Sequence, residues 1–181
     1  GARSTANKVM LLDFLTLSYY TFSGNWTGMA SVMQSQGVTP YMTTSRADIV
    51  NVPADVKLVI LHLPTGTFST SEVNGLKAFL AQGGRVLYIG ENSGFQYTLT
   101  AANLLLASMG ASTTATGACT YGIVTTSPHQ LTTGIPAAGS SGFFTNCGSI
   151  INPGAGDVVL MRDGSNNAIL VIANVNTTPI P

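Results

Sequence analysis

A glycine-bracketed turn at residues 90–94 is where this sequence comes closest to a catalytic motif. The apolar run 86–89 ends in Gly90-Glu91-Asn92-Ser93-Gly94. In several classes of α/β enzyme, a strand leading into such a turn holds a nucleophilic Cys or Ser midway between the two glycines. Here that residue is Asn92, whose amide is not a nucleophile, and Ser93 is one residue out of the G-x-S-x-G spacing. We therefore predict no catalytic residue in this turn.

The second group of chemically capable residues is polar and sits where predicted strands end. His62 lies near the end of the buried strand predicted at 56–64, and Asp13, Glu91, Asn92 and Ser93 are expected at the same edge of the sheet. Ligands of open α/β sheets bind at this edge. These five residues are our candidate ligand-binding residues, able to hold a small ligand or, through oxygens, a cation. The alternative is a set of caps and turn residues that bond only to loop backbone.

Two cysteines offer either a disulfide or a thiol. In an exported protein, Cys119 and Cys147 would form a bridge closing a loop of about 29 residues, worth about 3 kcal/mol in the chain-entropy model. In a cytosolic protein they would be two buried thiols. A catalytic Cys119 would need a base and a lowered pKa. His129, ten residues further on, keeps that alternative open, but we favour the bridge.

The sequence carries no recognisable cofactor or metal motif. It has no P-loop and no G-x-G-x-x-G after the first strand. Its two histidines are far apart, without cysteines or carboxylates at zinc-ligand spacing. The stretch 163–167 lacks the closing glutamate of a calcium loop and is better explained as a hairpin turn. We predict no cofactor and no metal. Asn25 and Asn176 begin glycosylation sequons, which matter only in a host that glycosylates.

Hydrophobic patterning predicts alternating strands and helices. Continuous apolar runs predict buried strands, and stripes at helical spacing that end at glycine predict helices. The strands are expected at 7–17, 38–44, 56–64 and 85–92, and the helices at 26–37, 69–84 and 98–110. Right-handed crossovers then give an α/β fold, a three-layer flavodoxin-like sandwich with a mainly parallel sheet. Beyond 110 the helical period stops, and 157–175 predicts a C-terminal β-hairpin.

Length and composition bound the class of protein. At 181 residues the chain suits one domain, 1–181, with 1–6 and 176–181 as extended termini. Charged residues make up 8 %, against about a quarter in a typical globular sequence. With 23 Thr, 16 Ser and a net charge of zero, the chain has no basic field for nucleic acid or an anionic membrane surface. No segment approaches the roughly 20 apolar residues of a membrane span.

A neutral, charge-poor surface has little colloidal repulsion and favours association. The chain is thus either a neutral monomer of extracellular type or a subunit that packs against its copies. It opens at Gly1 without Met, as a mature exported chain would, although a shortened chain would look the same. Neither end is expected to order itself. We expect a neighbouring subunit to hold them, for example as a strand added to a sheet edge; packing on the chain's own domain is the competing explanation.

Several stretches together resemble the class I glutamine-amidotransferase-like superfamily, over roughly 7–175. The most specific are "GLKAFLAQGGRVLYIGEN" and "HQLTTGI". The resemblance is closest to branches without amidotransferase activity, which include trehalose-utilisation-type domains and exported proteins. Catalytic branches carry a G-x-C-x-G turn in which Asn92 takes the place of the Cys, and no His follows His129 where the family's catalytic His lies. The resemblance therefore implies a flavodoxin-like fold without thioester chemistry.

The C-terminal stretch "NVNTTPIP" resembles the segment before the membrane anchor of exosortase-sorted (PEP-CTERM) bacterial surface proteins, although the sorting motif itself is not in this chain. We expect a non-enzymatic, exported structural protein that self-assembles into an extracellular filament, surface layer or matrix. Its partners would be copies of itself and extracellular polysaccharide, at the cell surface or outside the cell. The alternatives are a small-ligand or carbohydrate-binding module and a divergent hydrolase.

Overall fold

A computed structural model describes residues 6–13, 21–135 and 144–181. The chain, predicted as a single domain, contains two compact units. Unit 1 comprises Gly1–Ile89 with Thr177–Pro181, and unit 2 comprises Gly90–Asn176. The chain therefore passes from one unit to the other twice, after residue 89 and after residue 176. No helix among the described residues is both long and apolar enough to cross a membrane.

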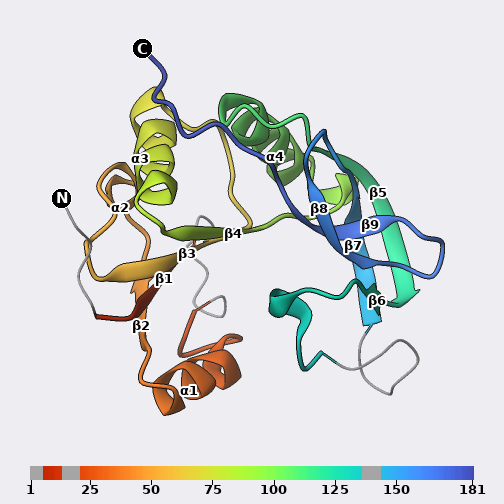
Figure 1. Ribbon diagram of the computed structural model, residues 1–181, viewed down its shortest axis with the longest axis horizontal. Helices are drawn as coiled ribbons and strands as arrows, with labels where there is room; N and C mark the ends of the chain where they lie inside the picture. The colour runs from red at the N-terminus through yellow and green to blue at the C-terminus, as the bar shows by residue number, and fades with distance from the viewer. Residues whose placement is uncertain (1–5, 14–20, 136–143) are drawn as a thin grey trace. The chain divides into compact units, whose positions relative to one another are not determined.

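Unit 1 is built on a parallel sheet of four strands in the order β2-β1-β3-β4 (Figure 1). This confirms the predicted α/β class and parallel sheet for the first half of the chain. The order matches the first four strands of a flavodoxin-like sheet. The strands are β1 (Lys8–Asp13), β2 (Thr39–Thr43), β3 (Val56–His62) and β4 (Arg85–Ile89), and the helices are α1 (Thr27–Ser35), α2 (Ala47–Val50) and α3 (Thr70–Ala81).

The inner strands β1 and β3 are buried on both faces, as their continuous apolar runs predict. On the face that carries α1, Val9, Leu11 and Ile60 form a cluster against Trp26 and Met33. Figure 1 shows α2 and α3 on the opposite face. The α3 residues at helical spacing are almost fully buried there: Val73, Leu76 and Phe79.

An ion pair organises the start of α3. Ser69 caps the helix in a capping box with Glu72. Arg46 donates to both oxygens of the same carboxylate, each over 2.8 Å, and also to the carbonyls of Thr65 and Thr67. The hydrogen bond from Arg46 is the main reason why the pKa of Glu72 lies below its ordinary value. One guanidinium thus joins the segment before α2, the loop before α3, and α3 itself.

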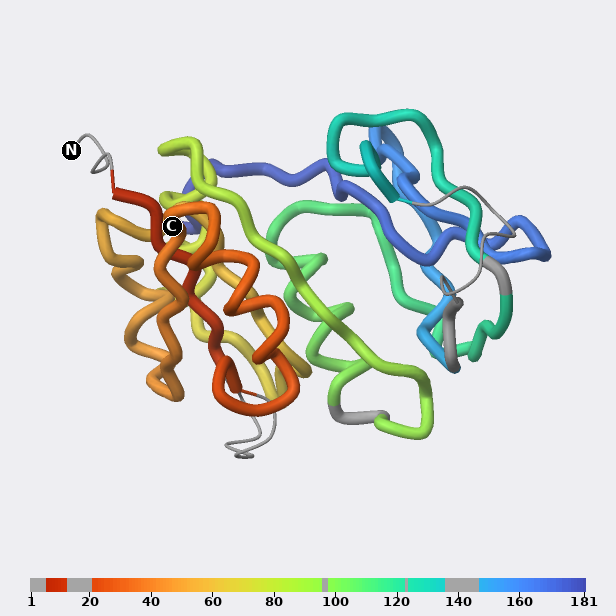
Figure 2. Tube along the Cα trace, turned by 90° about the horizontal axis from the view of Figure 1, so that it is seen from below, coloured from red at the N-terminus to blue at the C-terminus, as the bar shows by residue number. Residues whose placement is uncertain are grey.

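The C-terminal tail (Thr177–Pro181) belongs to unit 1, where it lies beside α3 (Figures 1 and 2). The Asn74 amide pairs with the backbone of Ile180, donating to its carbonyl over 2.9 Å and accepting from its N–H over 2.8 Å. Lys77 donates to the carbonyl of Thr178 over 3.0 Å. In the structure the chain's own helix holds this end, which is the explanation that competed with a neighbouring subunit. Residues 1–5, part of the predicted N-terminal extension 1–6, lie outside the described residues.

Unit 2 combines α4 (Gln96–Ser108) with an antiparallel sheet of five strands in the order β5-β7-β9-β8-β6. The strands β8 and β9 fall in the segment predicted as a hairpin and pair antiparallel. The sheet is larger than predicted, because strands that we did not expect precede this pair. Its members are β5 (Thr114–Ile123), β6 (Thr125–Thr126), β7 (Phe144–Asn152), β8 (Val158–Arg162) and β9 (Ala168–Ile172); η1 (Ser93–Phe95) and η2 (Gln130–Thr132) are short 3₁₀ turns.

The sequence does not predict β5, because a bulge interrupts the regular alternation of side chains along this strand. Its register with β7 shifts between Ala115 and Cys119, and Gly117 inside this bulge has a φ of +79°. Asn103 of α4 pairs with both the N–H and the carbonyl of Ala115, over 2.8 and 3.0 Å. A bulge and a side-chain amide thus cover part of an edge strand that carries no charge to protect it.

Buried Asp163 holds the turn between β8 and β9. One carboxylate oxygen accepts from the N–H groups of Ser165 and Asn167 over 2.9 and 2.8 Å. The other accepts from the Asn167 amide over 3.0 Å and from the Thr120 hydroxyl of β5. These bonds, that from Thr120 first, lower the pKa of Asp163 to about 2. The four bonds fasten the turn between β8 and β9 and connect it to β5.

Two glycine substitutions should change stability in opposite directions. A Cβ on Gly75 of α3 would collide with the carbonyl oxygens of Ile49 and Val50, whereas one on Gly28 of α1 has nothing within 4 Å. We expect Gly75→Ala to lower the free energy of unfolding by about 1–3 kcal/mol, despite alanine's better helix propensity. Gly28→Ala should raise it by about 0.5–1 kcal/mol. Urea unfolding measures both, and equal shifts would contradict the close approach of α2 and α3.

Acid should destabilise the protein in part through Asp163. Because its folded pKa is depressed, its contribution is present above the unfolded pKa near 4 and is lost as pH falls through about 2. The full contribution is about 2 kcal/mol. We expect the wild type to lose about that much more unfolding free energy than Asp163→Asn between pH 6 and pH 2, in urea titrations. Equal losses would show that this carboxylate is not the anchor described.

Candidate functional site

The carboxyl edge of the parallel sheet in unit 1 holds two of the predicted residues. Asp13 ends β1 and His62 ends β3, and the two are direct partners in the strand register. In flavodoxin-like sheets the ligand binds where the order reverses, between these two strands. Their backbone positions therefore agree with the prediction. The side chain of Asp13 lies outside the described residues.

His62 is bonded to a tryptophan from the start of α1. It is only 8 % exposed, and its Nδ1 accepts a hydrogen bond from Trp26 Nε1 over 3.0 Å. The rings meet edge-on, with centroids 5.6 Å apart. Because Nδ1 accepts, the proton of the neutral imidazole sits on Nε2. The bond thus sets the orientation and tautomer of the histidine at the sheet edge.

The residue after His62 has an unusual backbone conformation. Leu63 has a φ of +48° although it is neither glycine nor asparagine. Its side chain is buried, and its N–H donates to the carbonyl of Ile89 over 3.0 Å. Left-handed backbone costs such a residue about 1–2 kcal/mol, so the surroundings must hold it. Strained positions of this kind gather at binding and catalytic sites, and nothing in the sequence signals this one.

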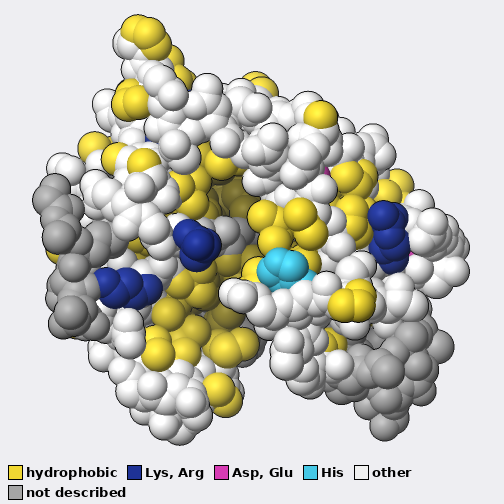
Figure 3. Space-filling model, viewed as in Figure 1, with side chains coloured by type: hydrophobic (Ala, Val, Ile, Leu, Met, Phe, Trp, Pro, Cys, Tyr) yellow, Lys and Arg dark blue, Asp and Glu magenta, His cyan; other side chains and the backbone are white. Residues whose placement is uncertain are grey.

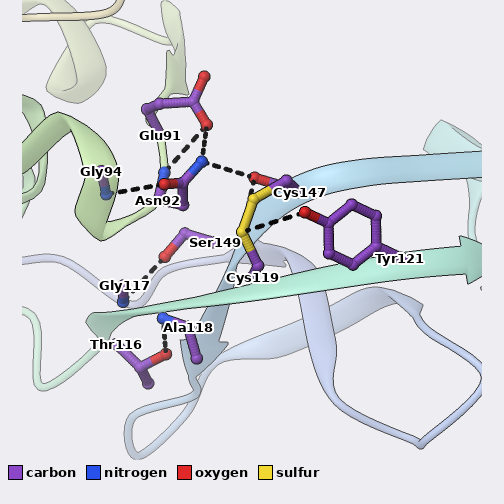
Figure 4. The surroundings of a disulfide bond; sticks show 10 residues. All are labelled: Glu91, Asn92, Gly94, Thr116, Gly117, Ala118, Cys119, Tyr121, Cys147 and Ser149. Carbon is purple, nitrogen blue, oxygen red and sulfur yellow. Dashed lines mark hydrogen bonds between the residues drawn. A yellow bond between two sulfur atoms is a disulfide. The ribbon is translucent and has the colours of Figure 1, made fainter.

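In unit 2, the Asn92 side chain closes the turn that precedes α4 (Figure 4). Its Nδ2 donates to Glu91 Oε1 over 2.8 Å and to the carbonyl of Cys147 over 3.0 Å. Its Oδ1 accepts from the N–H of Gly94 over 2.8 Å. One amide therefore stabilises the turn and attaches it to β7. Asn92 lies at a strand-to-helix turn, as predicted, but it acts as a structural cross-link.

Ser93 packs against the bulge of β5. A Cβ on Gly117 would lie 2.9 Å from the Cβ of Ser93, so only glycine lets the strand approach η1 this closely. Ser93 itself is exposed. Among the hydrogen bonds of the described residues, none joins a His or Cys side chain to Asn92 or Ser93. The arrangement is a packing contact.

The structure joins Cys119 of β5 to Cys147 of β7 in a disulfide, with the Cα atoms 4.4 Å apart. Cys147 has a φ of +56°, and its carbonyl is the group to which Asn92 donates. The Tyr121 hydroxyl points at the sulfur of Cys119, 3.8 Å away (Figure 4). Turn, disulfide and bulge thus form one connected region of unit 2, in which neither sulfur is a free nucleophile.

The predicted residues fall in different units. Asp13 and His62 belong to unit 1, and Glu91, Asn92 and Ser93 to unit 2, so their convergence on one edge stays a prediction. In the described part of the chain, no group of three or more His, Cys, Asp or Glu side chains could hold a metal ion. A hollow of ≈ 80 Å³ beside α3 is far smaller than the roughly 300 Å³ of small-molecule sites.

Both sequon asparagines lie on the surface. Asn25 is exposed in the turn before α1. Asn176 is also exposed, and its N–H donates to the carbonyl of Met109 over 2.8 Å. A glycan could be attached at either side chain without displacing a buried group, so use of the sequons stays a prediction.

Comparison with known proteins shows a similar fold in two solved structures. No protein-family model matches the chain, and no curated protein matches it. Two solved structures resemble it over 91 % of its length. The mmIFT52 N-terminal domain has a TM-score of 0.65 at 16 % identity, with 78 % of that chain covered. A ThuA-like protein from Bacteroides uniformis has a TM-score of 0.58 at 12 % identity, with 71 % covered. Likeness at such identities concerns the fold alone.

Substitution of Asn92 should test its structural role. Asn92→Asp removes the donor to the Cys147 carbonyl and places a second carboxylate beside Glu91. We expect the free energy of unfolding to fall by about 1–3 kcal/mol. The control Asn152→Asp makes the same change of charge at an exposed position of β7 and should shift stability by less than about 0.5 kcal/mol. If both substitutions lower the free energy of unfolding equally in urea, Asn92 does not have this structural role.

Proposed function

We propose that this chain is a non-enzymatic, exported structural module that assembles with copies of itself into an extracellular filament, surface layer or matrix. The observation that carries the proposal is the Asn92 amide. At the position where related turns hold a nucleophile, it bonds to Glu91, Gly94 and Cys147. A group with both polar atoms engaged in holding its own turn supports a structural role for the region.

The surface supports association between copies. Figure 3 shows one face, on which few charged side chains appear and apolar side chains are exposed in several places. All six acidic side chains that the structure describes bond within the chain: Asp48, Asp55, Glu72, Glu91, Asp157 and Asp163. Large apolar side chains are exposed as well, among them Met29 and Val32 on α1. Little charge thus opposes contact between copies.

We also propose the finer assignments of fold and location. Unit 1, with its strand order and its helices on both faces, supports a three-layer flavodoxin-like sandwich and membership of the class I glutamine-amidotransferase-like superfamily. The joined cysteines and the PEP-CTERM-like C-terminal stretch support export to the cell surface or beyond. Extracellular polysaccharide is the further partner that we propose there.

A second candidate is a module that binds a carbohydrate or another small ligand at the carboxyl edge of unit 1. The strained Leu63 beside the bonded pair of His62 and Trp26 favours it. Trp26 is the chain's one tryptophan, so its fluorescence reports directly on this edge. A saturable change on titration with an oligosaccharide, abolished in His62→Ala, would favour binding over assembly. For the third alternative, a divergent hydrolase, Ser93 is the nucleophile candidate that is left, and the described residues place no base beside it.

Assembly should be visible with the purified chain. In sedimentation velocity we expect the mean size to grow with protein concentration, and electron microscopy should show extended particles. Because few charges are involved, sodium chloride should change the association little, whereas ammonium sulfate should strengthen it. A single monomeric species at every concentration and salt would refute the assembly function.

A further inference from the structure

The contact between α3 and the tail has the chemistry of a peptide-binding site. Asn74 presents a donor and an acceptor to the N–H and carbonyl of Ile180, as a neighbouring strand would. One turn further along α3, Lys77 donates to the carbonyl of Thr178. Lys77 is only 3 % exposed, so its ammonium needs an acceptor in the protein. We name this pair of residues the α3 clasp.

The α3 clasp bonds to main-chain atoms of the tail. Pro179 and Pro181 keep the tail extended and provide no N–H, whereas Ile180 between them must provide one. The fitting ligand is therefore an extended peptide with carbonyls at its first and third positions and one N–H between two prolines. Every copy of this chain carries that peptide itself, in its tail.

The tail is placed to exchange between copies. Three of its five residues are exposed, Thr178, Pro179 and Pro181. Its bonds to α3 span sequence separations of 101 and 106 residues, and the same segment of another copy offers α3 the same carbonyls and the same N–H.

We propose that the α3 clasp of one copy binds the tail of a second copy. The proposal rests on the self-assembly function and names its contact. Each copy carries one clasp and one tail, so the contact is head-to-tail and propagates unless a ring closes. The exchanged segment is short and has no charged side chain.

Complementation between two defective copies tests the proposal. The first copy carries Asn74→Ala and keeps its tail; the second carries Ile180→Pro, which removes the N–H that the clasp requires, and keeps its clasp. Each alone should stay monomeric, and an equimolar mixture should form a 1:1 complex that grows no further. Native mass spectrometry distinguishes that complex from longer chains. The matched control Pro181→Ala leaves the three bonded backbone groups in place and should assemble as the wild type does.

A peptide-binding experiment tests the proposal even if one of the two variants in the mixture does not fold. The Ile180→Pro protein, checked by circular dichroism, should bind the peptide Asn-Thr-Thr-Pro-Ile-Pro at least tenfold more tightly than the same peptide with proline at its fifth position. If the wild type assembles and Ile180→Pro assembles equally, the exchange is refuted while the assembly function stands. If the wild type stays monomeric although the peptide binds, the clasp serves only its own tail, and both the exchange and the assembly function are refuted.

Discussion

Scarcity of charge is the constraint on which this structure depends. With seven acidic and seven basic side chains in 181 residues, the protein cannot build networks of ion pairs. The described carboxylates instead accept hydrogen bonds mainly from neutral groups, as Asp163 does from threonine, asparagine and backbone N–H groups. Bonds to a charged acceptor are about twice as strong as neutral ones. A few carboxylates therefore hold the turns of unit 2, and Glu72 with Arg46 does the same in unit 1.

Asparagine amides also join segments of the chain. Three of them bond to backbone where two segments meet. Asn74 joins α3 to the tail, Asn92 joins the turn at 90–94 to β7, and Asn103 joins α4 to β5. An amide offers both a donor and an acceptor without charge, so it can satisfy backbone in a neutral protein. The turn at 90–94 is an example, because its central residue Asn92 bonds to Glu91, Gly94 and Cys147.

The sequence predicts the elements whose signals are local. Apolar runs reveal β1 and β3, and Ser69, Glu72 and an apolar stripe reveal α3. The sequence does not predict the strands β5 and β7. In β5, threonine and glycine are frequent, and the bulge at Gly117 interrupts the alternation of apolar and polar residues that marks a strand. The sequence also predicts that His62 lies at the end of a strand and that Asn92 follows one, and both backbone positions agree with the structure. Their partners, Trp26 and the Cys147 carbonyl, lie 36 and 55 residues away, beyond the reach of any periodic pattern.

Because the tail packs on α3, unit 1 contains segments that are synthesised at different times. The helix α3 leaves the ribosome about a hundred residues before the segment that pairs with it. At 5–20 residues per second, that interval lasts roughly 5–20 s. Throughout it, Asn74 and Lys77 must be satisfied by water, in a nascent unit 1 that lacks its last five residues. The N-terminal unit can therefore be completed only after the whole of unit 2 has been synthesised.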